Sequence, residues 1–181
     1  MGDDYKRNST ESAMRDGTIL GLLWIVTFAT WVMVLKSIGS SYIFVISSAF
    51  AVLMFSSPVL AYMLAIRHRD NECNGTMSYS EAWIQIIIMY VCAILISSIA
   101  QLIFYVYIDP NLYADIIPLI EKIATEADLP SADTELLIQI FKTFNNISAK
   151  DIIVSQMSGH ITRDILLTSL LAFIVKKRNR K

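Results

Sequence analysis

The residues best suited to chemistry lie in the last apolar segment, where three ionisable side chains fall on one helical face. His160, Arg163 and Asp164, with Gln156 and Thr168, share an arc of about 140° at about 100° per residue. A charge at the centre of a bilayer costs about 2.5 kcal/mol or more unless it is paired or hydrated, so such residues often mark function. In a functional cluster, Arg163 would pair an anionic group, with Asp164 and His160 as a proton relay.

A structural role for the same cluster is the commoner situation. Arg163 and Asp164 would then lie near the outer interface of the membrane, paired with each other or with a neighbouring acidic segment. The last apolar segment is only marginally long enough to span a bilayer, so the outer boundary of this span could lie nearer to Arg163 and Asp164.

Other kinds of site are not indicated. The only two histidines, His68 and His160, are far apart in the sequence, and Cys73 and Cys92 have no partner at metal-ligand spacing. The sequence has no nucleophile–base pair and no phosphate-binding loop. The basic run 176–181 is better explained by topology and anionic lipid than by nucleic acid. We therefore expect a non-enzymatic protein with no cofactor, no metal and no nucleic-acid partner.

Composition places the cluster in a membrane protein. Of 181 residues, 55% are hydrophobic and 17% are charged, whereas about a quarter are charged in soluble domains. The clearest apolar run, Ala82 to Ile108, follows a helix-capping box, Ser78-Tyr-Ser-Glu81, and stops at Asp109-Pro110. Its 27 residues would form a helix about 40 Å long, against a hydrocarbon core of about 30 Å.

The fold class predicted is all-α and polytopic, with one four-helix membrane domain over 17–177. The predicted spans are 18–37, 42–66, 82–108 and 156–175. Residues 1–16 are expected to form a mobile, polar start, and 178–181 a basic tail. The insert 110–155 should form an amphipathic helical hairpin, with helices over 112–124 and from Ser131.

Two local motifs bear on helix packing. Gly17 and Gly21 form a G-x-x-x-G, which could let another helix approach closely, although a single motif near a helix end also arises by chance. Pro58, which follows Ser56 and Ser57, predicts a kink in the second span. A broken helix that binds a ligand is the less common alternative there.

The basic residues predict the orientation. Ten lysines and arginines lie in the amino-terminal start, the loop between the second and third spans, and the tail. Four lysines lie on the other side, and Arg163 lies within a span. The positive-inside rule therefore predicts both termini in the cytoplasm and the acidic insert 110–155 outside it.

The order of these parts resembles the DUF4199 family, small integral membrane proteins found mainly in the Bacteroidota. The resemblance covers about Thr18 to Lys177, without the usual glycine before the final apolar run. It rests on Gly17-Thr-Ile-Leu-Gly21, Arg67-His-Arg69, Ser78-Tyr-Ser-Glu-Ala82, Tyr107-Ile-Asp-Pro110 and Ile174-Val-Lys-Lys177. It implies a four-span protein of the bacterial inner (plasma) membrane, and no catalytic residue carries over from it.

Two functions fit these features. The first is a non-enzymatic accessory or scaffold subunit whose acidic hairpin contacts a periplasmic or membrane partner. The alternative is a small transporter or channel subunit that uses the polar face of the last helix, oligomeric because four spans barely enclose a pathway. Besides the lipid bilayer, the partners expected are a second copy or another membrane protein. A cavity that reaches His160 and Asp164 would favour the transporter, and a packed bundle the accessory subunit.

Overall fold

The computed structural model describes residues 2–126 and 131–177. The described chain is helical apart from short connections and has no strand; Met77 and Lys177 form one isolated bridge. The helices are α1 (Gly2–Lys36), α2 (Ile43–Glu72), α3 (Tyr79–Ile103), the π-helical turn η1 (Phe104–Ile108), α4 (Leu112–Glu126), α5 (Ser131–Asn146) and α6 (Ala149–Val175). The all-α prediction is therefore confirmed. The basic tail 178–181 and the connection 127–130 lie outside the described residues.

Four of these helical segments are long and apolar enough to cross a membrane. They are Thr10–Lys36, Ile43–Glu72, Tyr79–Ile108 and Ala149–Val175. The four predicted spans are thus present, and the protein is a multi-pass membrane protein. The third begins at the predicted capping box: Ser78 accepts from the backbone N–H of Glu81, and the Glu81 carboxylate accepts from the backbone N–H of Ser78.

Two boundaries differ from the sequence prediction. α6 begins at Ala149 rather than Gln156, because the hydroxyl of Ser148 accepts from the backbone N–H of Asp151 and caps the helix seven residues earlier. α1 is already helical at Gly2, where we had expected a mobile start. Both differences lengthen a helix that lines the site described below.

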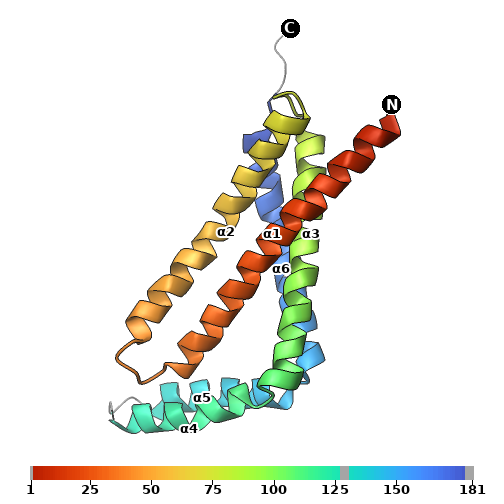
Figure 1. Cartoon of the computed structure of the whole chain (residues 1–181). Helices are drawn as coiled ribbons and strands as arrows, with labels where there is room; N and C mark the ends of the chain where they lie inside the picture. Colours follow the sequence, from red (N-terminus) through yellow and green to blue (C-terminus); the bar gives the residue numbers. More distant parts are fainter. Residues whose placement is uncertain (1, 127–130, 178–181) are drawn as a thin grey trace.

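The four long helices form a bundle in which α3 packs against both α1 and α6, while α2 packs mainly against α1 (Figure 1). α1 begins and α6 ends at the same end of this bundle. α4 and α5 pack against each other and lie across the opposite end. Their position outside the cytoplasm stays a prediction.

Contacts at both ends fix the bundle. At the end where α6 stops, Arg69 donates to the carbonyl of Val175 at 3.1 Å, and the backbones of Met77 and Lys177 exchange two hydrogen bonds. At the other end, Lys36, the last residue of α1, forms an ion pair with Asp109, which follows η1. These contacts therefore join the ends of helices that are distant in the sequence.

The two glycines of the G-x-x-x-G motif lie directly against α3. A Cβ atom on Gly17 would lie 2.6 Å from the carbonyl oxygen of Met89 and 2.7 Å from the Cβ of Cys92. A Cβ on Gly21 would lie 3.3 Å from the Cα of Ala93. The motif thus marks a close helix–helix approach, the first of the two readings considered above.

We predict that Gly17→Ala destabilises the protein by about 1–3 kcal/mol, because the added methyl group meets the backbone of α3 and must push the helices apart. The measurement is thermal unfolding in detergent. Gly159→Ala is the matched control, since a Cβ there meets nothing within 4 Å and alanine favours a helix by about 1 kcal/mol over glycine. Equal stability of the two variants would contradict the close approach.

Candidate intramembrane binding site

A cavity of about 330 Å³ lies between the four spanning helices. Its walls are aromatic and apolar on α1 and α2, including Trp24, Trp31 and Phe50. The polar groups that face it come mostly from α3 and α6: Gln101, Gln156, His160 and Arg163, with Ser57 from α2. A few polar groups in a mostly apolar cavity of this size are typical of small-molecule sites.

The three residues singled out from the sequence lie together. Arg163 Nε donates to Asp164 Oδ1 at 2.9 Å, and Arg163 Nη2 donates to His160 Nδ1 at 2.7 Å. A guanidinium can only donate, so His160 Nδ1 carries no hydrogen and the imidazole is neutral. Asp164 is 1% exposed, whereas the side chain of Arg163 is 45% exposed. The carboxylate therefore lies behind the guanidinium, which faces the cavity.

Trp24 completes the cluster from α1. Its ring stacks on His160 with centroids 4.9 Å apart, and the Cζ of Arg163 lies 5.6 Å from its centre, a cation–π distance. Its indole N–H donates to Ser57 Oγ at 2.7 Å, which links α1 to α2. The sequence analysis missed Trp24. It could have been found from the stripe Gly17, Gly21, Trp24, whose spacing puts all three on one face of a helix.

A second, apolar gap of about 290 Å³ adjoins the cavity between α2 and α6. It shares Phe50, Met54, Ser57 and Arg163 with the first cavity, and Leu167 closes its other side. Pro58 lies in its lining, inside the uninterrupted α2. We call this second, apolar cavity the apolar slot. The guanidinium of Arg163 lies where the first, more polar cavity meets it.

Arg163 lies near the middle of its helix. It comes 14 residues after Ala149 and 12 before Val175 in the 27-residue α6. The structural alternative placed Arg163 and Asp164 near the outer interface, paired with each other or with the acidic segment. The two residues do pair with each other, and their depth in the membrane stays a prediction.

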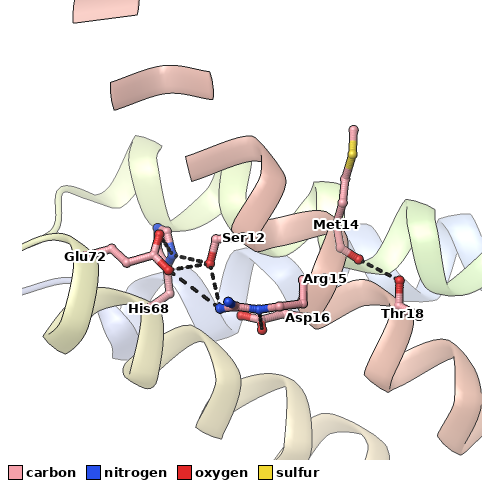
Figure 2. Close-up of polar contacts among 7 residues, drawn as sticks. All are labelled: Ser12, Met14, Arg15, Asp16, Thr18, His68 and Glu72. Atoms are coloured by element: carbon pink, nitrogen blue, oxygen red, sulfur yellow. Dashed lines mark hydrogen bonds and ion pairs between the residues drawn. The ribbon is translucent and has the colours of Figure 1, made fainter. Parts of the chain in front are cut away.

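A second polar cluster joins α1 to α2 at the end of the bundle where the chain begins (Figure 2). The hydroxyl of Ser12 donates to Glu72 Oε1 at 2.7 Å. His68 Nδ1 lies 3.1 Å from Glu72 Oε2 and 3.2 Å from Ser12 Oγ, so this nitrogen carries the hydrogen. Arg15 lies 3.7 Å from both Glu72 and the buried Asp16.

This second cluster was not predicted, because its members come from segments interpreted as a mobile start and a basic loop. No group of three or more His, Cys, Asp or Glu side chains within residues 2–126 and 131–177 could hold a metal ion. The contacts instead fasten the first two spans together. The cluster is a polar clasp between α1 and α2.

A family model described as a protein of unknown function (DUF4199) matches residues 15–177. The chain belongs to the DUF4199 family. The match includes every residue that lines the two cavities, and of the clasp it leaves out only Ser12. No curated protein and no solved structure matches this DUF4199 protein.

We predict that Ser12→Ala destabilises this DUF4199 protein by about 1–3 kcal/mol, because it removes a hydrogen-bond partner from the buried His68 and from Glu72. Unfolding in detergent measures the effect. Thr18→Ala is the control: its hydroxyl only bonds the carbonyl of Met14 in its own helix, at an exposed position (Figure 2). If both variants unfold alike, the clasp contributes nothing.

Proposed function

We propose that this DUF4199 protein is a non-enzymatic small transporter subunit that binds an anionic amphiphile in the intramembrane cavity. The observation that carries the proposal is the half-exposed side chain of Arg163, in the middle of α6, at the junction of a polar cavity and an apolar slot. Charges at this depth are costly, which favours a role beyond packing.

Arg163 has donors to spare for a ligand. A guanidinium offers five N–H groups in a planar fork; Asp164 takes one at Nε and His160 takes one at Nη2. The remaining groups suit the oxygens of a carboxylate, sulfonate or phosphate, which accept two parallel bonds from arginine. The rings of Trp24 and His160 hold the guanidinium in place.

The apolar slot suits the tail of such a ligand. Phe50, Met54 and Leu167 line it between α2 and α6, and the adjoining surface of α2 carries exposed apolar side chains such as Phe55. A ligand could therefore enter sideways from the lipid, with its head group directed to Arg163. A single-chain anionic amphiphile fits this combination better than a small hydrophilic anion.

An accessory subunit is the second candidate. α5 exposes Leu136 and Ile140, which are 58% and 42% accessible, on a helix that has a polar opposite face. Such a face suits the membrane surface or a second membrane protein, including another copy of the chain. In neither proposal does the protein act on nucleic acid.

We further propose that the protein resides in the bacterial inner membrane with both termini in the cytoplasm. Arg67 and Arg69 lie at the end of the bundle where α1 begins and α6 stops, whereas Lys36 and Lys122 belong to the opposite half. The excess of basic residues at the first end supports a cytoplasmic position for it.

Alkaline phosphatase, which is active only outside the cytoplasm, tests this orientation. Inserted after Ser41, between α1 and α2, it should be active; inserted after Gly75, between α2 and α3, it should be inactive. The two insertions control for each other, because both loops are short and join the same helix. The reverse pattern would place the termini outside the cytoplasm.

Ligand binding is tested with a brominated long-chain alkyl sulfonate, since bromine quenches tryptophan fluorescence on contact. The protein carries Trp31→Phe and Trp83→Phe, which leaves Trp24 as the reporter. We expect saturable quenching that unlabelled alkyl sulfonate reverses and the alcohol of equal chain length does not. A hydrogen bond to a charged group contributes about 1.5–3 kcal/mol, so Arg163→Gln should weaken binding by roughly ten- to a hundredfold.

The matched control is Lys150→Gln, which removes one positive charge from the exposed first turn of the same helix. It should leave the affinity unchanged. The double variant Arg163→Gln/Asp164→Asn removes both charges without leaving a buried carboxylate unpaired, and it should show the same loss as Arg163→Gln. Undiminished binding by that folded double variant would contradict the proposal.

A further inference from the structure

Behind the guanidinium of Arg163, three buried side chains from α3 and α6 each carry an oxygen without a hydrogen-bond partner. They are Tyr90, Asp164 and Thr168, each at most 1% exposed. The unpartnered atoms are Tyr90 Oη, Asp164 Oδ2 and Thr168 Oγ1. We call these three side chains the buried row.

The helix register brings these side chains to the same depth. α3 and α6 run in opposite directions, and Trp83 Nε1 donates to Ser169 Oγ at 3.3 Å, which sets their alignment. Counting from this pair, Tyr90 is level with Asp164 to within about two residues, and Thr168 lies about one turn from Asp164 on the same face of α6. At about 1.5 Å per residue, the row extends for about 6 Å along the bundle axis.

Leaving these groups unpaired in a membrane is costly. No bulk water reaches the hydrocarbon core, and each unsatisfied group there costs several kcal/mol. Asp164 is the centre of the row because its two oxygens differ: Oδ1 accepts from Arg163 and Oδ2 has no partner. A hydrogen on Oδ2 would find acceptors in the row.

We infer that binding of an anion at Arg163 is coupled to the uptake of one proton by Asp164 at Oδ2. The inference rests on the proposed function and extends it to a coupled ion. Without a ligand, Arg163 and Asp164 together are neutral. An anion beside Arg163 brings the total to −1 at mid-depth, where net charge is expensive. A proton from the aqueous phase, bound to Oδ2, returns the total to zero.

The surroundings of Asp164 favour it as the proton acceptor. The titratable groups that face it are Arg163 and, through Arg163, His160 on α6, and Tyr90 on α3. The neighbouring groups from α1 and α2, Trp24 and Ser57, are neutral. A proton on His160 Nδ1 would stand 2.7 Å from a guanidinium nitrogen and would break their hydrogen bond. A protonated Asp164 instead gains an acceptor such as Thr168 Oγ1 or Tyr90 Oη.

The test measures the dissociation constant of the brominated alkyl sulfonate, which stays charged, between about pH 6 and pH 8. If one proton binds with each anion, the constant rises about tenfold per pH unit. Asp164→Asn should bind without pH dependence. His160→Gln should keep the tenfold slope, whatever its effect on affinity.

An infrared difference spectrum provides a second readout in the unmutated protein. Saturation with the sulfonate, which has no carboxyl group, should produce the C=O band of a protonated carboxylic acid. Thr168→Val, which removes a neighbouring hydroxyl while preserving shape, should shift that band and so assign it to Asp164. This readout keeps the inference testable if Asp164→Asn does not fold.

The outcomes separate this inference from the proposed function. Saturable binding with no pH dependence and no carboxyl band overturns the inference alone. A slope that persists in folded Asp164→Asn, that is lost in His160→Gln, or that depends on sodium concentration instead of pH also overturns it. Failure of the sulfonate to bind at any pH overturns the proposed function and the inference with it.

Discussion

The contact of α1 with α3 at Gly17 and Gly21 positions the rest of the bundle. Because no side chain separates the two helices there, the backbone of α1 lies directly on Met89 and Ala93. Trp24 follows on the same face of α1, so its ring reaches into the bundle rather than into lipid. It stacks with Tyr90 of α3, at 6.1 Å between centroids, and with His160 of α6. A close backbone contact therefore decides where the aromatic wall of the cavity stands.

Trp24 in turn supports a charge in the middle of an apolar helix. The cost of Arg163 is shared among an ion pair with Asp164, a hydrogen bond to His160 and the face of the indole ring. These contacts surround one side of the guanidinium and leave the other open to the cavity. The ion pair Lys36–Asp109, at the end of the bundle, needs no such support because water can reach it.

Sequence patterns predicted the features that depend on neighbouring residues. The capping box at Ser78 and Glu81 starts α3 as expected, and the helical segment stops at Asp109. The spacing of His160, Arg163 and Asp164 predicted that they share a face, and they do bond one another. Such signals lie within about one turn of helix, so they can be recognised without knowledge of the fold.

Features that depend on how helices cross were not predictable in the same way. Trp24 and Ser57 are 33 residues apart, and Ser12 and Glu72 are 60 apart. Their pairing follows from the tilt and close approach of α1. The early start of α6 was overlooked for a different reason. Ser148 is a good cap, but the span was counted back from the basic tail over a standard membrane thickness, which placed the start too late.

The positions of buried polar atoms without hydrogen-bond partners indicate whether the bundle satisfies its own hydrogen bonds in the absence of a ligand. Of six buried side-chain atoms without a hydrogen bond among the residues described, three lie in the buried row, two are the amide atoms of Gln85 and one is in Asp16. Two buried tyrosines differ in this respect. The hydroxyl of Tyr105 is hydrogen-bonded to that of Tyr113 at 3.0 Å, whereas the hydroxyl of Tyr90, beside Asp164, has no hydrogen-bond partner. Three unpartnered oxygens therefore lie behind the guanidinium that faces the cavity, and natural proteins tend to leave such local rules unmet at functional sites.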